Sequence, residues 1–186
     1  MSFQPPITAR QLESGDFRRV VVSLGSNLPN GKRLPGELLQ DAFSHLERAF
    51  DAPLQMSSFW ETDPECCPPG TPPFINAIVT GWLPCSLGPE QVLESLHAIE
   101  AAFGRVRDAT VNAPRLLDLD LVCLGGLICQ GPGLRLPHPR AHLRGFVLRP
   151  LAELCPELVL PGQAHTVLEL VDNLPVSGDK KIPHRP

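Results

Sequence analysis

The chain has 186 residues, of which 42% are hydrophobic and 19% are charged, and a formal net charge of −4 at pH 7. A chain of this length suits one domain and can bury a core without disulfides or structural metals. The acidic balance argues against a nucleic-acid-binding protein that relies on a broad basic surface.

The termini and the cysteines bear on cellular location. No apolar stretch approaches the roughly 20 residues that a membrane helix needs, and the N-terminus lacks the apolar core of a signal peptide. The six cysteines include no C-x-x-C pair, which favours reduced thiols. We therefore expect a cytoplasmic monomer without membrane or nucleic-acid partners.

Residues 1–16 are polar and show no periodicity, and we expect them to be a disordered tail. The predicted elements follow this stretch. A β-branched run at 18–23 predicts a first strand, and Gly25 starts the turn that ends it. A single domain is expected over 17–175. The stretch 176–186, rich in proline and lysine, is expected to be a second flexible tail.

Apolar spacing predicts the remaining elements. In chain order they are a helix from Pro35 to Phe50, strands at 54–60 and 74–83 around a proline-rich segment, a helix from Pro89 that Gly104 ends, strands at 116–124 and 127–129, and helical pieces at 144–153 and 166–172. The order β-α-β-β-α-β is the split, ferredoxin-like arrangement. The predicted fold class is therefore α+β, a mainly antiparallel sheet with helices packed on it as an α/β sandwich.

The predicted strand at 116–124 carries two carboxylates one residue apart. Because strand side chains alternate, Asp118 and Asp120 project from one face, while Leu117, Leu119 and Leu121 project from the other. Like charges at this spacing repel, so a divalent cation between them is one interpretation, and Mg²⁺ binds through carboxylates and substrate phosphates. A simply solvated outer face is the other interpretation.

Four sequence blocks carry a resemblance to a known family. They are Val22 to Leu28 (VSLGSNL); Ser57 to Thr62 (SSFWET) with Phe74-Ile75-Asn76; Ile99-Glu100 and Gly104 to Arg107 (GRVR) through Pro114 to Asp120 (PRLLDLD); and Pro137-His138-Pro139 with Arg144-Gly145-Phe146. In this order they resemble the 6-hydroxymethyl-7,8-dihydropterin pyrophosphokinase family over roughly residues 18–175.

The resemblance implies an activity: magnesium-dependent transfer of pyrophosphate from ATP to the hydroxymethyl group of 6-hydroxymethyl-7,8-dihydropterin. The products are AMP and the pterin pyrophosphate, in a step of folate biosynthesis. By the same resemblance, Asp118 and Asp120 hold two Mg²⁺ ions and act in catalysis together with Arg105 and Arg115. Two metal ions can stabilise both the attacking and the leaving oxygen.

The resemblance also assigns binding residues. Those implied for ATP are Glu100, Arg105, Arg115, His138 and Arg144, and those implied for the pterin are Thr62, Phe74, Asn76 and Phe146. Guanidinium groups suit phosphates through their planar fork, and an asparagine amide offers the donor and acceptor that match a pterin edge.

Departures from the family pattern fall outside these assignments. Asp108 stands where a basic residue is usual, Asn112 where tryptophan is frequent, and Gly133 at a basic position for which the nearby Arg135 can substitute. Two other function classes would need features of their own. A two-metal phosphodiesterase would need further acidic ligands, and a non-catalytic ferredoxin-like module that binds RNA would need aromatic residues on the sheet face.

Overall fold

The computed structural model describes residues 15–65, 67–104 and 115–182. A six-stranded antiparallel sheet forms its middle layer, in the order β5-β1-β4-β3-β8, with the short β2 also paired to β4. The strands are β1 (Phe17–Ser26), β2 (Leu54–Met56), β3 (Phe59–Thr62), β4 (Phe74–Pro84), β5 (Asp118–Leu124) and β8 (Lys180–Ile182).

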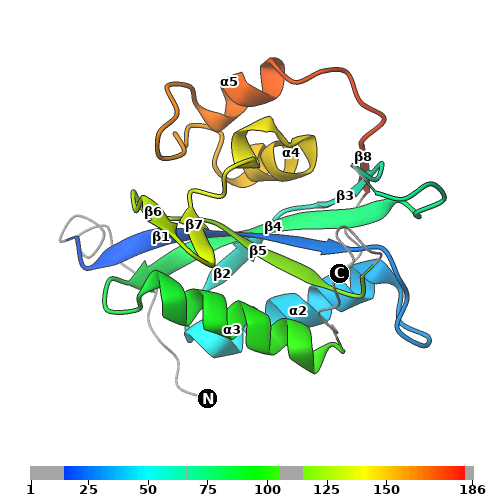
Figure 1. The fold of residues 1–186 in the computed structure, drawn as a ribbon, viewed down its shortest axis with the longest axis horizontal. Helices are drawn as coiled ribbons and strands as arrows, with labels where there is room; N and C mark the ends of the chain where they lie inside the picture. The colour runs from blue at the N-terminus through cyan, green and yellow to red at the C-terminus, as the bar shows by residue number, and fades with distance from the viewer. Residues whose placement is uncertain (1–14, 66, 105–114, 183–186) are drawn as a thin grey trace.

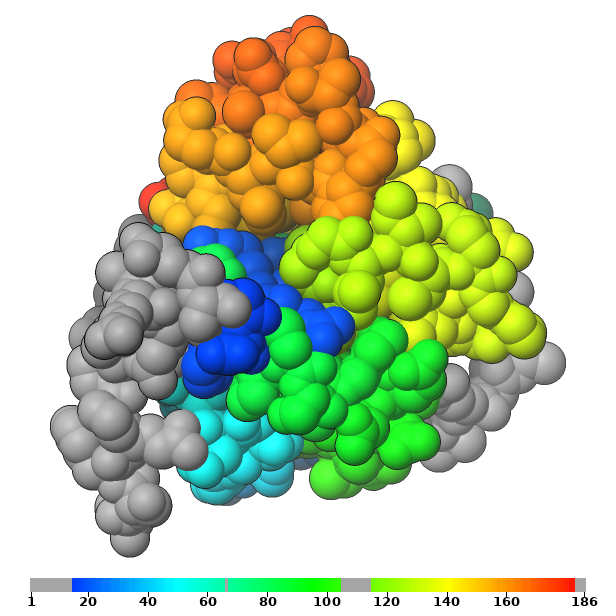
Figure 2. Space-filling model, turned by 90° about the vertical axis from the view of Figure 1, so that its left-hand side faces the viewer, coloured from blue at the N-terminus to red at the C-terminus, as the bar shows by residue number. Residues whose placement is uncertain are grey.

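Helices cover both faces of this sheet (Figure 1). On one face lie α2 (Pro35–Phe50) and α3 (Pro89–Ala102), and on the other lie α4 (Gly145–Leu154) and α5 (Val167–Asp172). A hairpin of β6 (Cys129–Gly131) and β7 (Leu134–Leu136) and a 3₁₀ turn at Ala141–Leu143 connect β5 to α4. In the space-filling view the α5 region, in orange, forms the top of the molecule and α3, in green, lies at the bottom (Figure 2).

This arrangement confirms the predicted ferredoxin-like α+β sandwich. The two predicted long helices begin where expected, with Pro35 and Pro89 at their first positions. Side chains complete their first turns, since Glu37 accepts a hydrogen bond from the Leu34 amide and Gln91 accepts one from the Gly88 amide.

Alternation along β1 divides the apolar residues between two cores. Val20, Val22 and Leu24 pack with α2 and α3, whereas Val21 packs with α4 and α5. The register between β1 and β5 shifts between Val21 and Val22, a β-bulge that adds Val122 to the α4 side. Both faces of β1 are therefore buried between helices.

The structure corrects several predicted boundaries. The strand predicted at 54–60 is two strands, because Ser57 still pairs with Ile78 while the Ser58 amide donates to Glu153 on α4. The strand predicted at 127–129 lies instead at 129–131 with a partner at 134–136. No helix in the described part of the chain is long and apolar enough to cross a membrane.

The C-terminal boundary also differs from the expectation of a flexible tail from 176. Residues 180–182 form β8, which pairs with β3 at the edge of the sheet. Alternation and length gave no sign of this strand, because three residues with two lysines carry no apolar period. The extent of the domain at both ends stays a prediction.

Packing around Gly81 on β4 yields the first testable prediction. A Cβ at Gly81 would lie 2.5 Å from Leu54 Cδ2 and 3.0 Å from the Pro53 carbonyl oxygen. Gly81→Ala therefore has to move the buried Leu54 side chain and presses on the Pro53 carbonyl, so we expect it to lower the free energy of unfolding by about 1–3 kcal/mol. Gly126→Ala is the matched control, since nothing lies within 4 Å of its Cβ position. Urea denaturation of both variants measures the difference, and equal stabilities would contradict this packing.

Candidate active site

Three neighbouring strands bring polar and small residues together on the face that α4 covers. Gly25 on β1 lies opposite Asn76 on β4 and opposite Asp118 on β5, and Ser23 lies opposite Asp120. The predicted alternation is observed, because Asp118 and Asp120 line a cavity while Leu119 and Leu121 belong to the opposite core. The face of β5 that carries Asp118 and Asp120 is therefore one wall of a pocket.

This cavity has a volume of about 270 Å³ and collects most of the predicted site residues. Nine of them line it: Thr62, Phe74, Asn76, Arg115, Asp118, Asp120, His138, Arg144 and Phe146. Arg105 lies outside the described residues. Glu100 is not among the lining residues.

One end of the cavity is built around the buried Asn76 side chain. Its Nδ2 donates a 2.8 Å hydrogen bond to Thr62 Oγ1, which fixes the plane of the amide. A Cβ at Gly25 would lie 3.0 Å from Asn76 Oδ1, so the glycine keeps the space beside this acceptor open. Phe74 and Phe146 line the cavity from the sheet and from α4, which suits a flat aromatic ligand with a polar edge.

The other end combines carboxylates with a guanidinium group. Arg115 Nη1 lies 2.8 Å from Asp118 Oδ2 in an ion pair that is about four-fifths buried on each side. Carboxylate oxygens are the ligands that Mg²⁺ prefers, and the metal usually completes its shell with water and substrate phosphates. Among the described residues there is no cluster of three or more metal-ligating side chains. Asp118 and Asp120 therefore fit a metal ion that a phosphate ligand shares.

Asn27 is a structural residue of the site that sequence reasoning missed. Its backbone amide donates to the Arg115 carbonyl, its Oδ1 accepts from the Arg115 amide at 2.9 Å, and its Nδ2 donates to the Pro72 carbonyl at 3.3 Å. Asn27 thus ties the proline-rich segment to the segment that enters β5. Its sequence signals were a polar residue directly after a strand and its place in the block Val22 to Leu28.

Glu100 is almost fully buried and acts on the backbone of β5. Its Oε1 accepts a 2.8 Å hydrogen bond from the Leu119 amide, between the two aspartates. This contact fixes the strand segment that presents Asp118 and Asp120. The nucleotide contact implied for Glu100 by the family resemblance stays a prediction.

A cationic wall comes from the segment between β7 and α4. Its positive charges are those of Arg140 and Arg144, beside which His138 lies, and Arg140 was not predicted. The His138 amide donates to the Val122 carbonyl at 2.8 Å, which fastens this wall to β5. Burial and the neighbouring Arg140 lower the pKa of the Arg144 guanidinium, which nevertheless stays charged at neutral pH.

His138 is neutral in this environment. Burial, followed by the charges of Arg144 and Arg140, lowers the pKa of its imidazole to about 4. The Arg140 amide donates to His138 Nδ1 at 3.3 Å, so the neutral ring carries its proton on Nε2. His138 therefore presents a hydrogen-bond donor rather than a full charge.

A second cavity of about 330 Å³ adjoins the first and shares Asp120 and His138 with it. Its other walls are mainly apolar and come from Leu93 on α3, Leu121 on β5 and the β6–β7 region, including Leu134 and Arg135. The two cavities therefore meet at Asp120 and His138.

Comparison with known proteins gives one consistent match. Residues 21–156 match the family model described as 7,8-dihydro-6-hydroxymethylpterin-pyrophosphokinase. The chain is 38% identical over 168 residues to the 2-amino-4-hydroxy-6-hydroxymethyldihydropteridine pyrophosphokinase of Pseudomonas aeruginosa, which covers 90% of this chain and 98% of that protein. It is also 38% identical over 154 residues to the Synechocystis protein of the same name, covering 83% of this chain and 75% of that one.

A solved structure shares the fold. The crystal structure of wild-type Plasmodium falciparum HPPK-DHPS with pteroate matches with a TM-score of 0.64 at 13% identity, covering 84% of this chain. This chain spans 42% of the length of that larger protein. At this identity the likeness concerns the fold alone.

The environment of His138 predicts a pH dependence. A histidine with a pKa lowered in the folded state takes up its proton in the unfolded state first, so folding stability falls as the pH drops from about 6.5 towards 4. His138→Gln should flatten this part of the stability curve. Urea denaturation between pH 7 and pH 4.5 measures it, and NMR titration of the ring reports the pKa directly. A ring that titrates near pH 6.5 in the ligand-free protein would contradict the proposed environment.

Proposed function

The chain belongs to the 7,8-dihydro-6-hydroxymethylpterin-pyrophosphokinase family, and from this premise we propose how its residues divide the work of the reaction. The enzyme transfers pyrophosphate from ATP to the hydroxymethyl group of 6-hydroxymethyl-7,8-dihydropterin, a step of folate biosynthesis. The phosphodiesterase and the non-catalytic binding module are not favoured.

The observation that carries the division of roles is the register of β1. Gly25 has Asn76 on one side and Asp118 on the other, so a ligand at the amide and a ligand at the carboxylates meet over a strand without bulk. We assign the pterin to the end formed by Asn76, Thr62 and the two phenylalanines. We assign the triphosphate to the end formed by the aspartates and the cationic wall.

At the pterin end, Phe74 and Phe146 stack on the faces of the ring and Asn76 binds its polar edge. Thr62 acts through Asn76, because its hydroxyl accepts the amide hydrogen bond that orients the side chain. Together these contacts would hold the pterin with its hydroxymethyl group pointing towards Asp118.

At the phosphate end, we propose that Asp118 and Asp120 would hold two Mg²⁺ ions. Bound metal ions neutralise phosphate charge and lower the barrier to in-line displacement. The bond that forms joins the hydroxymethyl oxygen to the β-phosphorus, and the bond that breaks joins the β-phosphorus to the α–β bridging oxygen, which leaves with AMP. The hydroxymethyl group loses its proton, so the products are AMP, the pterin pyrophosphate and one proton. Arg115, Arg144 and the His138 Nε2–H donate to the phosphate oxygens, and we assign Arg105 to the same group.

We further propose a cytoplasmic, monomeric enzyme whose partners are its two small-molecule substrates. The five described cysteines are free thiols, which agrees with a reducing compartment. Sedimentation of the purified protein tests the oligomeric state.

The activity itself is tested by incubating the protein with Mg-ATP and the hydroxymethyl dihydropterin. We expect AMP and the pterin pyrophosphate in equal amounts, with AMP formation dependent on the pterin. AMP that forms at the same rate without pterin would indicate hydrolysis and contradict the transfer.

Removing the charge of either aspartate should abolish most turnover. Asp118→Asn and Asp120→Asn keep the side-chain shape but lose the charge that balances Mg²⁺, so we expect the turnover number to fall by at least about 100-fold. The control is Asp41→Asn, which removes an exposed ion pair with Arg33. Steady-state assays at saturating ATP measure the effect. Near-normal turnover in either site variant would show that the pair is structural.

A side chain at Gly25 should lower the affinity for the pterin more than the affinity for ATP. Gly25→Ala places a methyl group 3.0 Å from Asn76 Oδ1, and we expect pterin affinity to fall by about tenfold or more. Arg115→Ala should instead weaken the unreactive ATP analogue, because we assign its guanidinium to a phosphate. Calorimetric titration of each variant with each ligand measures both effects, and the reverse pattern would mean that the two ends have been exchanged.

A further inference from the structure

The segment at residues 175–182, called the C-terminal strap below, links α4 to the edge of the sheet. It lies beyond residue 156, where the match to the family model ends. The strap leaves the end of α5, runs alongside α4 and ends in β8, which pairs with β3 through Trp60 and Lys181 (Figure 1).

Two polar clusters fasten the strap to α4. At the C-terminal end of the helix, Glu153 lies 3.2 Å from Lys181 Nζ and accepts hydrogen bonds from Trp60 Nε1 at 2.7 Å and from the Ser58 amide at 3.0 Å. Burial alone would raise the pKa of Glu153, but these hydrogen bonds outweigh it and lower the pKa. Glu153 is therefore a charged anchor that holds helix, strap and β3 together.

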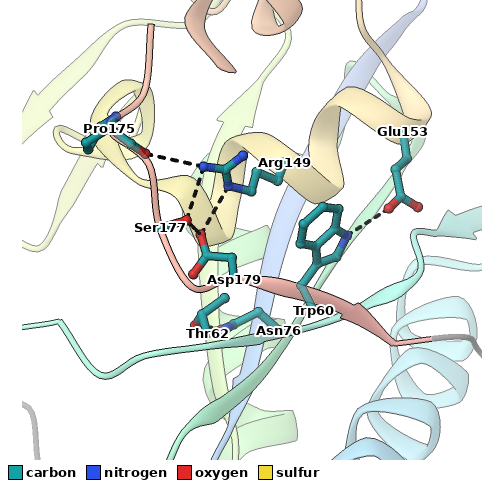
Figure 3. A network of polar contacts seen from close by, with 8 residues as sticks. All are labelled: Trp60, Thr62, Asn76, Arg149, Glu153, Pro175, Ser177 and Asp179. Carbon is teal, nitrogen blue, oxygen red and sulfur yellow. Dashed lines mark hydrogen bonds and ion pairs between the residues drawn. The ribbon is translucent and has the colours of Figure 1, made fainter. Parts of the chain in front are cut away.

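The second cluster centres on Arg149 and Asp179 (Figure 3). Arg149 Nε lies 3.1 Å from Asp179 Oδ2, and its Nη2 donates to Ser177 Oγ at 3.1 Å and to the Pro175 carbonyl at 3.5 Å. Ser177 Oγ donates to the same carboxylate oxygen at 2.6 Å. The Asp179 side chain is only 11% exposed, so its position is well determined by these partners.

Asp179 also contacts the start of α4. A Cβ at Gly145 would lie 3.0 Å from Asp179 Oδ2, so the carboxylate packs against the first residue of the helix. The first turn of α4 contains no acidic residue, and the side chain of its N-cap residue, Arg144, makes no capping hydrogen bond. Asp179 therefore supplies from the strap the negative charge that stabilises a helix N-terminus.

That first turn carries two residues of the site. Arg144 and Phe146 line the main cavity, and the Arg144 guanidinium lies 5.1 Å from the centre of the Phe146 ring. A further cavity of about 320 Å³ lies between the site and the strap, since both Phe146 and Asp179 line it, together with Thr62. Only the first turn of α4 therefore separates Asp179 from the Phe146 side chain at the main cavity.

We propose that Asp179, held by Arg149 and Ser177, is a positioning residue that sets Phe146 and Arg144 for the reaction through its contact with Gly145. The proposal rests on the assigned roles of Phe146 and Arg144 in the proposed function. The strap is then a working part of the site and contributes more than thermal stability.

The test uses the full chain and compares two alanine variants. Asp179 contacts the N-terminal end of α4, and Glu153 lies near its C-terminal end. We expect Asp179→Ala to raise the KM for pterin by about tenfold, because a misplaced ring no longer stacks well. It should also speed hydrogen exchange at the Val147 and Leu148 amides, which both donate to the Arg144 carbonyl. Glu153→Ala removes a strap anchor of equal charge and should leave the pterin KM within about twofold, whatever it does to the melting temperature.

A double-mutant cycle makes the contact itself testable. Gly145→Ala presses a methyl group on Asp179 and should raise the pterin KM in the parent chain, but it should add little in the Asp179→Ala background. Non-additive effects support the proposal. Additive effects, or equal pterin KM changes in Asp179→Ala and Glu153→Ala, would overturn it in favour of general loosening of α4. The parent chain serves as the separate test of function, because failure of its pyrophosphate transfer would overturn the assigned reaction whatever the variants do.

Discussion

The fixed register of β1 between β4 and β5 is the constraint on which the site depends. A slip by one residue would turn Val22 and Leu24 towards the site and place Ser23 and Gly25 in the core beside α2 and α3. Because the register is locked, Gly25 always has Asn76 on one side and Asp118 on the other. The two substrates are brought together by the same pairing that builds the core.

Contacts within the protein hold the charged groups of the site. Arg115 already pairs with Asp118, and Glu100 holds the backbone between the aspartates. The cationic wall is fastened to β5 through the His138 amide. The backbone that carries these groups is held in place, which limits its reorganisation during the reaction.

The sequence predicted the features that depend on local periodicity. The alternation of Asp118 and Asp120 with leucines, and the proline starts of α2 and α3, follow from backbone geometry within a few residues. It could not predict Asn27, which bonds to Arg115 and Pro72 far along the chain, or β8, whose pairing with β3 depends on the path of the strap. Such contacts are properties of the assembled fold, and no short window of residues contains them.

The hydrogen bond between Trp60 and Glu153 gives the molecule an optical reporter. The chain has two tryptophans, and Trp82 lies beneath the Arg19 guanidinium on β1, at 4.4 Å. Trp60 stands where β3, α4 and the strap meet, next to a carboxylate and opposite Lys181 in the sheet. Indole emission depends on nearby charge and on exposure to water, so the fluorescence of a Trp82→Phe protein registers whether the strap is seated, without any attached dye.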